Sequence, residues 1–365
     1  MLFVALELSR TTWVLAASDR NGVVEKRAMV SAHDYPALER LFVALKKKLG
    51  LSPDAVVRTC YEAGRDGFSV HRALVDMGHE NVVLDPASIE VSRRAHAKTD
   101  RLDASRLLRL LLRLAGGERA AHVVEVPTEE QEDARHLHRE REKLLNSRTS
   151  ETNRIAGLLA TQGIECNGRT LVLDEVDEMS LSSGAPIPPG LRARVARAIE
   201  ARDLFCRQLR NVEREIKAEL KTLEASKDVV DDNPVMLQKL RAIGIHGAFV
   251  LAREMFFRKF KNRRQVGAYT GLVPVPKLSG AGGHVGSISK AGNRRVRRVL
   301  VEQAWLWLRH QPNSALSRWF EQRWGTGKRS RRIGIVALAR KLAIALWRYL
   351  DAGLVPDGAT LKANA

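Results

Sequence analysis

The chain has 365 residues, enough for two or three domains, and a formal net charge of +19 with a pI of about 10.3. No apolar run approaches the ~20 residues that a membrane-spanning helix needs, which excludes an integral membrane protein. The three cysteines, Cys60, Cys166 and Cys206, are far apart, which excludes a disulfide framework and a zinc-binding spacing. The composition therefore indicates a cytosolic protein whose partner is a polyanion.

The first part of the chain alternates strand and helix signals. Strands are predicted over residues 2–8, 12–18, 23–30, 56–63 and 81–86, and helices over residues 35–49 and 68–77. Three hairpin-connected strands followed by strands that alternate with helices predict a mixed sheet with flanking helices. This order matches the RuvC or ribonuclease-H type of fold.

From Thr128 onward the pattern becomes charged, helical and nearly free of Gly and Pro. It opens with a capping-box pair, Thr128 and Gln131. A loop rich in Gly, Ser and Pro over residues 180–190 precedes a second long helical stretch over residues 191–225. Two long helices around a loop indicate a coiled-coil arm, although two ordinary domain helices would give a similar pattern. Dimerisation, RNA binding and a spacer role all fit such an arm.

The last segment is predicted to be mainly helical. A helix, a glycine-containing turn and a helix occupy residues 237–255, and helical patterns return over residues 295–310 and 333–350. The glycine-rich stretch 267–292 is predicted to be the least regular part of the chain. Trp305, Trp307, Trp319 and Trp324 could stack on bases, but the helical spacing of Trp305 and Trp319 favours the core. The predicted domains are 1–126, 127–232 and 233–350, followed by a tail over 351–365.

Four acids stand where a metal-dependent nuclease needs them: Glu7, Glu62, Asp100 and Asp103. Carboxylate oxygens are natural ligands of Mg²⁺, and two such ions can stabilise an in-line phosphoryl transfer. Asp100 and Asp103 could instead complement a helix dipole, and Glu62 could be an ordinary strand-end acid. Glu7 is harder to explain away, because an acid between two leucines in an apolar strand costs free energy unless it is paired or metal-bound.

A serine and a basic run form the other predicted site. From Lys290 to Arg348 the sequence holds fifteen Lys or Arg residues and two acids, a composition typical of a nucleic-acid-binding surface. Ser279 lies in a glycine-rich stretch just before this run, where a DNA backbone could approach closely. Ser287 and Ser289 lie equally near it, so the residues alone do not select one serine. The cations predicted to contact phosphates are Lys290, Arg294, Arg295, Arg297 and Arg298.

The combination resembles the DEDD transposases of the IS-one-ten group of insertion sequences, which includes Piv-like DNA invertases. The specific segments are KTDRLDA, at residues 98–104, and the pattern from FKNRRQVGAYTGLVP to SISKAGNRRVRRVL, at residues 260–300. The resemblance implies a RuvC-like domain, a coiled-coil arm and a C-terminal transposase domain with a serine nucleophile. It implies that Glu62, Asp100 and Asp103 bind Mg²⁺ or Mn²⁺, with Glu7 where the family usually has Asp. Ser279 matches the nucleophile.

The resemblance also implies partners. These are donor DNA, target DNA and a structured non-coding guide RNA, bound by homodimers that pair into tetramers in the cytoplasm at the nucleoid. The guide RNA would then recognise the DNA sequence by base pairing, so the protein itself would need mostly contacts to phosphates and to the shape of the nucleic acid. We expect Ser279 of one subunit to meet the acids of another in a composite site. The alternatives are a RuvC-like junction resolvase without a covalent intermediate and a non-catalytic nucleic-acid-binding protein.

Overall fold

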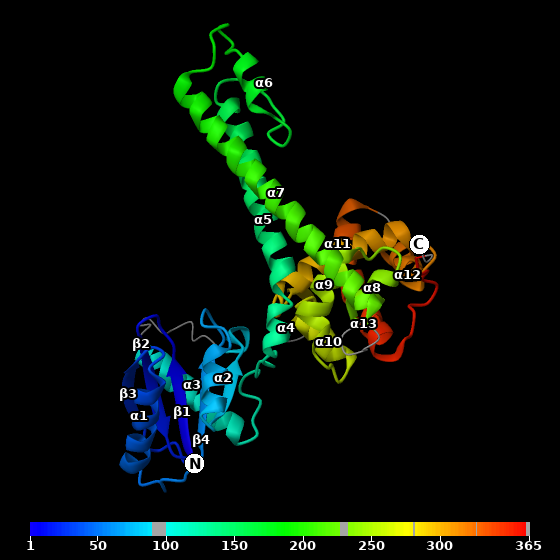
Figure 1. Ribbon diagram of the computed structural model, residues 1–365. Helices are drawn as coiled ribbons and strands as arrows, with labels where there is room; N and C mark the ends of the chain where they lie inside the picture. The colour runs from blue at the N-terminus through cyan, green and yellow to red at the C-terminus, as the bar shows by residue number, and fades with distance from the viewer. Residues whose placement is uncertain (90–99, 227–232, 280–281, 326, 363–365) are drawn as a thin grey trace. The chain divides into compact units, whose positions relative to one another are not determined.

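The computed structural model describes residues 1–89, 100–226, 233–279, 282–325 and 327–362 (Figure 1). The chain divides into two compact units, Met1–Pro127 and Thr128–Ala365. Each unit has hydrophobic clusters of its own. The prediction of a mixed α/β sheet followed by helices is confirmed, whereas coiled-coil geometry for the arm stays a prediction.

Unit 1 is a five-stranded mixed sheet covered on both faces. Its elements are β1 (Leu2–Glu7), β2 (Thr12–Ser18), β3 (Lys26–Ser31), α1 (Tyr35–Lys48), β4 (Val57–Glu62), α2 (Ser69–Asp76), β5 (Glu80–Leu84), a 3₁₀ turn (Pro86–Ser88) and α3 (Asp100–Ala115). The strand order is β3-β2-β1-β4-β5, with the first three strands antiparallel and β4 and β5 parallel to β1. This topology is consistent with a RuvC-like fold.

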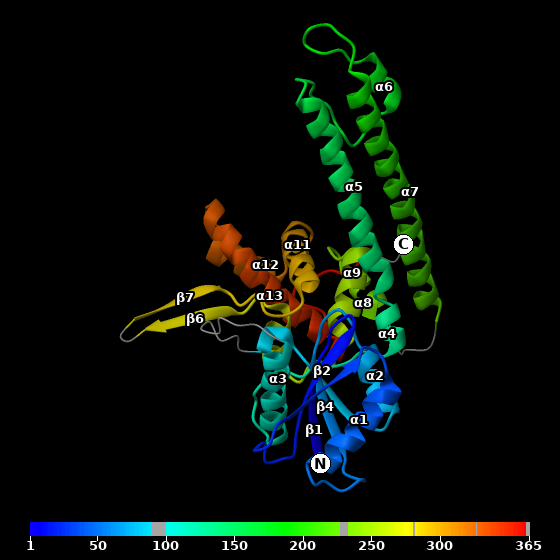
Figure 2. The same cartoon turned by 90° about the vertical axis from the view of Figure 1, so that its left-hand side faces the viewer.

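The alternation of β1 explains why helices cover both faces of the sheet. Leu2, Val4 and Leu6 are fully buried against α1 and α2. Phe3 and Ala5 point to the opposite face and pack beneath α3. Because successive strand residues face opposite sides, a strand that is apolar at every position must be covered twice. Figure 2 shows α3 on one side of the sheet and α1 and α2 on the other.

Unit 2 begins with two long helices that lie side by side in Figures 1 and 2. The elements of this arm are α4 (Glu129–Asp133), α5 (His136–Ala160), α6 (Leu173–Glu178) and α7 (Pro189–Ala225). The predicted capping box is present, with Thr128 accepting from the Gln131 backbone and the Gln131 side chain accepting from the Thr128 N–H. Buried Ile155 and Leu159 of α5 pack with Val195 and Ile199 of α7. This apolar seam holds the two helices together.

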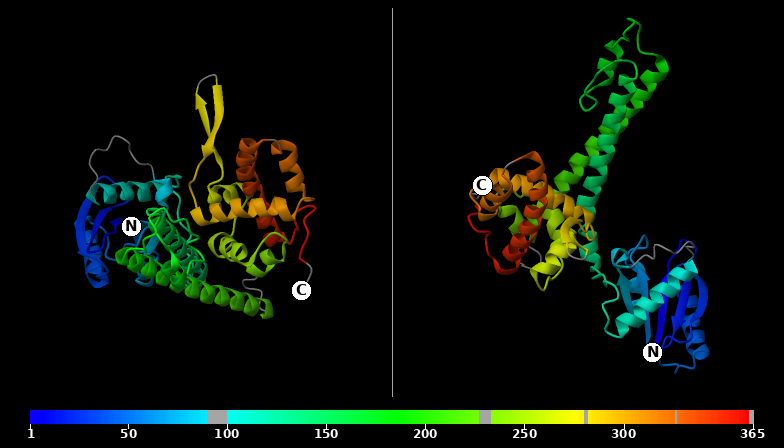
Figure 3. Two further views of the ribbon diagram at one scale, coloured as in Figure 1. Left: turned by 90° about the horizontal axis from the view of Figure 1, so that it is seen from above. Right: turned by 180° about the vertical axis from the view of Figure 1, so that it is seen from behind.

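The rest of unit 2 is a helical body with one projecting hairpin. Its elements are α8 (Asn233–Lys239), α9 (Ile245–Leu251), a π-helical turn (Ala252–Phe256), α10 (Arg263–Thr270), β6 (Pro274–Ser279), β7 (Gly282–Ile288), α11 (Arg294–His310), α12 (Ala315–Trp324) and α13 (Lys328–Ala352). The prediction that residues 267–292 are irregular was wrong: they include the end of α10 and the antiparallel β6–β7 ladder. Figure 3 shows this hairpin projecting from the helical body. A projecting two-stranded ribbon pairs its inward-facing backbone groups and leaves the others to water, so it needs no apolar run that a sequence pattern would reveal.

The tryptophan prediction for α11 was also wrong. Trp307 is fully buried, whereas Trp305 is 41% exposed. The buried face of α11 repeats every three or four residues through Val296, Leu300 and Ala304 to Trp307, which leaves Trp305 on the outer face. Trp319 packs at the edge of the same core, as predicted.

Candidate active site

Two of the four predicted acids end neighbouring parallel strands. Glu7 is the last residue of β1, and Glu62 is the last residue of β4. The pairing of Leu6 with Tyr61 makes Glu7 and Glu62 the next residues along the same ladder. Ala5 and Cys60, two positions before Glu7 and Glu62, pack beneath α3. Because side chains alternate along a strand, both acids lie on the same face of the sheet as α3. Glu7 is half-buried and Glu62 is exposed.

The first turn of α3 brings the other pair to this edge. The Cys60 thiol lies 3.7 Å from the Leu107 carbonyl oxygen, which sets the helix against β4. Asp103 precedes Leu107 by about one turn and is half-buried. Figure 2 shows α3 beginning at the end of the sheet where β1 and β4 end. Asp100 is the first residue of α3, but its side chain lies outside the described part of the structure.

We call Glu7, Glu62, Asp100 and Asp103 the acidic edge. Its donor set is purely carboxylate, which suits a hard cation such as Mg²⁺ that binds through a few carboxylates and retains water. Among the described side chains, no three acids, histidines or cysteines gather closely enough to hold an ion. Glu7, Glu62 and Asp103 thus do not form such a group by themselves, and the four-acid metal site stays a prediction.

Ser279 lies at the far end of the projecting hairpin in unit 2. It is the last residue of β6, and its backbone pairs with Gly282 of β7. Its side chain lies outside the described part of the structure. The acids belong to unit 1 and the serine to unit 2, so the composite site stays a prediction.

Two glycines hold the base of this hairpin close to the helical body. Gly271 has φ +65° and Gly292 has φ +105°, both in the left-handed region that glycine adopts at little cost. A Cβ on Gly271 would lie 2.2 Å from the Ala291 carbonyl oxygen, and one on Gly292 would lie 2.3 Å from the Tyr269 carbonyl oxygen. The chain segments before β6 and after β7 are therefore in close backbone contact, and a side chain at Gly271 or Gly292 would clash.

The five predicted phosphate-binding cations divide into two groups. Arg295 and Arg298 of α11 both pair with Glu142 of α5, at 2.5 and 2.8 Å. Burial of Glu142 would raise the pKa of its carboxyl, but these two guanidinium groups lower that pKa below its ordinary value.

The other three cations occupy the start of α11 and the residues before it. Arg297 donates to the Lys290 carbonyl oxygen at 3.1 Å. Lys290 and Arg294 are exposed and form no ion pair with any carboxylate in the described ranges. Two of the five cations are thus available to phosphates, whereas three also hold the fold together.

A buried acid that the sequence did not single out joins four elements of unit 2. Glu254, in the π-helical turn, is only 3% exposed. Its carboxylate accepts from His138 at 3.0 Å and from Arg139 at 2.7 and 3.1 Å, both on α5. It also accepts from Asn293 at 3.0 Å, and Asn293 caps the N-terminus of α11. Tyr269 of α10 donates to the Glu254 backbone carbonyl.

The electrostatics of Glu254 follow from these partners. Burial alone would raise the pKa of its carboxyl, but the hydrogen bonds from His138 and Arg139 hold that pKa well below the ordinary value. Glu254 is therefore a buried, charged carboxylate whose oxygens accept hydrogen bonds from three side chains. No local pattern revealed it, because its stretch of sequence reads as an ordinary helix.

Comparison with known proteins identifies the chain. A DEDD transposase model of the IS110 type, described as "Transposase", matches residues 9–162, and a model described as "Transposase IS116/IS110/IS902 family" matches residues 236–318. The protein y4rJ of Sinorhizobium fredii, which carries a transposase name, is 42% identical over 99% of this chain and 94% of its own length. The chain belongs to the IS116/IS110/IS902 transposase family. It is therefore an insertion-sequence transposase, an enzyme that cuts and rejoins DNA.

More distant members of the family agree. The transposase for insertion sequence element IS1328 of Yersinia enterocolitica is 25% identical over 86% of this chain and 89% of its own length. The transposase for insertion sequence element IS1111A of Coxiella burnetii is 28% identical over 77% of this chain and 74% of its own length. Within the described ranges of the transposase, no helix is long and apolar enough to cross a membrane.

Proposed function

We propose that this transposase cuts and rejoins DNA strands through Ser279, with a divalent metal held by the acidic edge. The observation that carries the metal half of the proposal is the register of β1 and β4. It sets Glu7 and Glu62 on adjacent parallel strands, under the helix that begins with Asp100 and Asp103. A bound Mg²⁺ or Mn²⁺ would stabilise the negative charge that builds on the phosphate oxygens in the transition state.

The replacement of the family's usual aspartate by Glu7 is compatible with this role. A glutamate carboxylate reaches about one C–C bond farther from the backbone than an aspartate does. Because Glu7 is the last residue of β1, the chain beyond it is free of the ladder and can accommodate the longer reach. The carboxylate of either an aspartate or a glutamate can bind Mg²⁺.

The serine half of the proposal is a transesterification. The Ser279 Oγ attacks a DNA phosphorus, an Oγ–P bond forms, and the bond from phosphorus to one DNA oxygen breaks. The hydroxyl proton passes to a carboxylate of the acidic edge, and the departing DNA oxygen takes up a proton. Attack by a hydroxyl of the partner strand on the phosphoserine then reverses the exchange and rejoins the DNA. One phosphoester bond replaces another at each step, so no nucleotide triphosphate is needed.

Lys290 and Arg294 would hold the DNA backbone during this exchange. They lie next to the β7 end of the hairpin and are exposed, and guanidinium and ammonium groups neutralise phosphate charge. We further propose that a structured guide RNA from the same element selects the donor and target DNA, and that dimers pair into a tetramer. The net charge of +19 supports two nucleic-acid partners.

The deciding experiment is recombination between donor and target plasmids with the element's flanking RNA and Mg²⁺. It compares the wild type with Ser279→Ala, Asp103→Asn and Ser287→Ala, the last being a matched serine on the same hairpin. Covalent protein–DNA adduct is measured by denaturing electrophoresis of labelled DNA. We expect adduct and recombinants with the wild type and with Ser287→Ala, and neither with Ser279→Ala or Asp103→Asn.

Two outcomes would overturn the proposal. Strand cleavage that survives in Ser279→Ala but is lost in Asp103→Asn would make the enzyme a metal nuclease of the junction-resolvase type. Adduct that persists in Ser279→Ala and disappears in Ser287→Ala would move the nucleophile to the other strand of the hairpin.

A further inference from the structure

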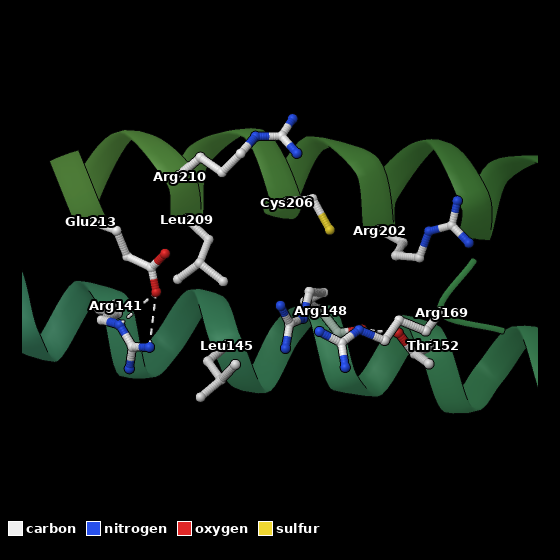
Figure 4. A pocket seen from close by; sticks show the side chains of 10 residues that line it. All are labelled: Arg141, Leu145, Arg148, Thr152, Arg169, Arg202, Cys206, Leu209, Arg210 and Glu213. Atoms are coloured by element: carbon white, nitrogen blue, oxygen red, sulfur yellow. Dashed lines mark hydrogen bonds and ion pairs between the residues drawn. The ribbon is translucent and has the colours of Figure 1, made fainter. Parts of the chain in front are cut away.

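A cavity of about 490 Å³ lies between the two long helices of the arm. Figure 4 shows its lining side chains, which come from α5, from α7 and from the loop before α6. Five of them are arginines and one is an acid: Arg141, Arg148, Arg169, Arg202, Arg210 and Glu213. Such an excess of guanidinium groups indicates an anionic ligand.

Two of the five arginines have partners within the protein. Arg141 pairs with Glu213 at 2.8 Å. Arg202 is only 3% exposed and donates to the carbonyl oxygens of Gly168 and Leu171, at 2.9 and 2.7 Å, while also pairing with Asp203. These two guanidinium groups therefore organise the walls of the cavity.

The other three arginines have no carboxylate partner in the part of the arm that the structure describes. All three line the cavity: Figure 4 shows Arg148 and Arg169 next to each other at α5, and Arg210 on the side of α7 that faces away from α5. Like charges without a counter-ion repel one another, and a bound anion would offset this electrostatic repulsion. Three of the five guanidinium groups that line the cavity therefore carry positive charge that no described carboxylate offsets.

The loop that carries Arg169 is fixed in place by its neighbours. A Cβ on Gly168 would lie 2.3 Å from the Thr152 carbonyl oxygen, so the loop backbone lies directly against α5. The buried Arg202 guanidinium of α7 donates hydrogen bonds to two backbone carbonyls of the same loop. The backbone on either side of Arg169 is therefore packed against both helices, while the Arg169 side chain itself is exposed at the cavity.

A second hollow on α7 continues this basic surface. Arg207, Arg210, Arg214 and Lys217 line it at a spacing of three or four residues, so they share one face of the helix. Arg207 and Lys217 are ten positions apart, which corresponds to about 15 Å along the helix axis. A run of positive charge of that length matches a polymer with successive phosphates better than one small anion.

We propose that this arm cavity, with the adjoining face of α7, binds the sugar–phosphate backbone of a nucleic acid. Arg148 and Arg169 supply the two contacts inside the cavity, and Arg210 continues the track onto α7. The proposal concerns binding alone and does not depend on Ser279, on a metal or on strand cleavage. A failure of the serine mechanism would therefore leave it unaffected.

The test uses the full-length protein and three labelled probes of 40 nucleotides or base pairs: single-stranded RNA, single-stranded DNA and duplex DNA. Affinity is measured by fluorescence anisotropy from 50 to 200 mM salt, without divalent metal. The variant Arg148→Gln with Arg169→Gln is compared with Arg194→Gln plus Arg197→Gln. The control removes the same charge from exposed positions of α7 that do not line the cavity.

For the cavity variant we expect at least about tenfold weaker binding at 150 mM salt. The slope of log affinity against log salt should become shallower by about 1.4 with single strands or about 1.8 with duplex. A loss seen only with RNA identifies RNA as the ligand, and one seen only with a DNA probe identifies DNA. An unchanged affinity, or an equal loss in the control, would overturn the proposal.

A second pair of variants separates geometry from net charge. Gly168→Ala keeps every charge but should displace the loop and Arg169, and we expect about a threefold or greater loss of affinity. Gly157→Ala, on α5 with open space around its Cβ position, should bind like the wild type. Thermal unfolding checks that each variant is folded. Wild-type affinity in a folded Gly168→Ala variant would show that the cavity geometry plays no part.

Discussion

At the scale of single residues, Glu254 is the acid on which the helical body of unit 2 depends most. Its carboxylate gathers donors from α5 and from the cap of α11, and its backbone carbonyl accepts from α10. A buried charge of this kind is tolerated only when hydrogen bonds satisfy it completely. The elements that carry the hairpin and Ser279 are thereby tied to the base of the arm.

The pKa of Glu254 predicts a loss of stability in acid. Its folded-state pKa is below its ordinary value of 4.5, so its contribution is complete above about pH 4.5 and is lost as the pH falls toward the lower folded value. We expect Glu254→Gln to lower the free energy of unfolding by about 3–5 kcal/mol at pH 7, since it leaves Arg139 and His138 without their charged partner. The variant should also show a weaker pH dependence. Urea unfolding followed by circular dichroism at pH 7 and at several values below about pH 4.5 measures both effects.

Glu302→Gln provides the control for that experiment. Glu302 is exposed on α11, and within the described residues its ion pair is a long one, 3.7 Å, with Arg298. Its substitution should cost at most about 1 kcal/mol. If the two variants lose equal stability, Glu254 does not have the structural role assigned to it.

The division among the basic residues predicts two different phenotypes. Lys290→Gln with Arg294→Gln should weaken DNA binding and make the salt slope shallower by about 1.8, with little change in thermal stability. Arg295→Gln with Arg298→Gln should lower the melting temperature, because Glu142 then loses both of its partners. Anisotropy titrations in salt, paired with thermal unfolding, separate the two pairs. Unchanged melting temperatures in both variants would contradict the division.

At the scale of elements, the base of the β6–β7 hairpin is tightly constrained, at the opposite end of the ribbon from Ser279. Gly271 and Gly292 let two connections pass within van der Waals distance, and Asn293 then starts α11 at once. The helical body thus fixes the root of the ribbon, while the ribbon itself extends away from it (Figure 3). A hairpin built in this way can present a residue at its far end to a partner.

Gly292→Ala should therefore abolish recombination while leaving unit 1 folded. Its Cβ would lie 2.3 Å from a backbone oxygen, and its φ of +105° is strained for alanine. Gly353→Ala is the matched control, because Gly353 also has a positive φ but has open space around its Cβ position. We expect near-normal recombination from the control, in the plasmid assay described above. Normal recombination by Gly292→Ala would show that the close approach is dispensable.

At the scale of the whole molecule, the two units divide the predicted chemistry between them. Unit 1 holds the acidic edge, and unit 2 holds Ser279, the arm cavity and the available cations. The boundary falls at Pro127, immediately before the capping box that starts α4. A proline at the boundary is typical of a junction between domains.

This division predicts that residues 1–127 fold when produced alone. The sheet of unit 1 is covered on both faces within those residues, so it needs nothing from unit 2 to bury its core. Circular dichroism and a dispersed amide NMR spectrum of the fragment test this directly. Calorimetry of the full chain should then show two transitions. A disordered fragment together with a single transition would mean that the units fold only as one.

The sequence by itself determined the features that depend on short-range periodicity and on local motifs. The alternation of β1, the helical spacing of α1 and α13 and the capping box at Thr128 appear in the structure where they were predicted. Glu62 was predicted to end a strand, as it does, whereas Glu7 was predicted within a strand over residues 2–8 and is in fact the last residue of β1. Their adjacency follows from the parallel pairing of β1 with β4, which the structure supplies.

The tertiary structure alone decided which polar groups are paired and which are available. His138 and Glu254 are 116 residues apart, and Glu142 meets Arg298 across 156 residues. A periodic pattern shows which face of an element is apolar, but not which distant element will cover it. The same reason explains Trp305, Arg295 and the cavity between α5 and α7. Their burial, pairing and charge depend on contacts that form only when separate elements pack together.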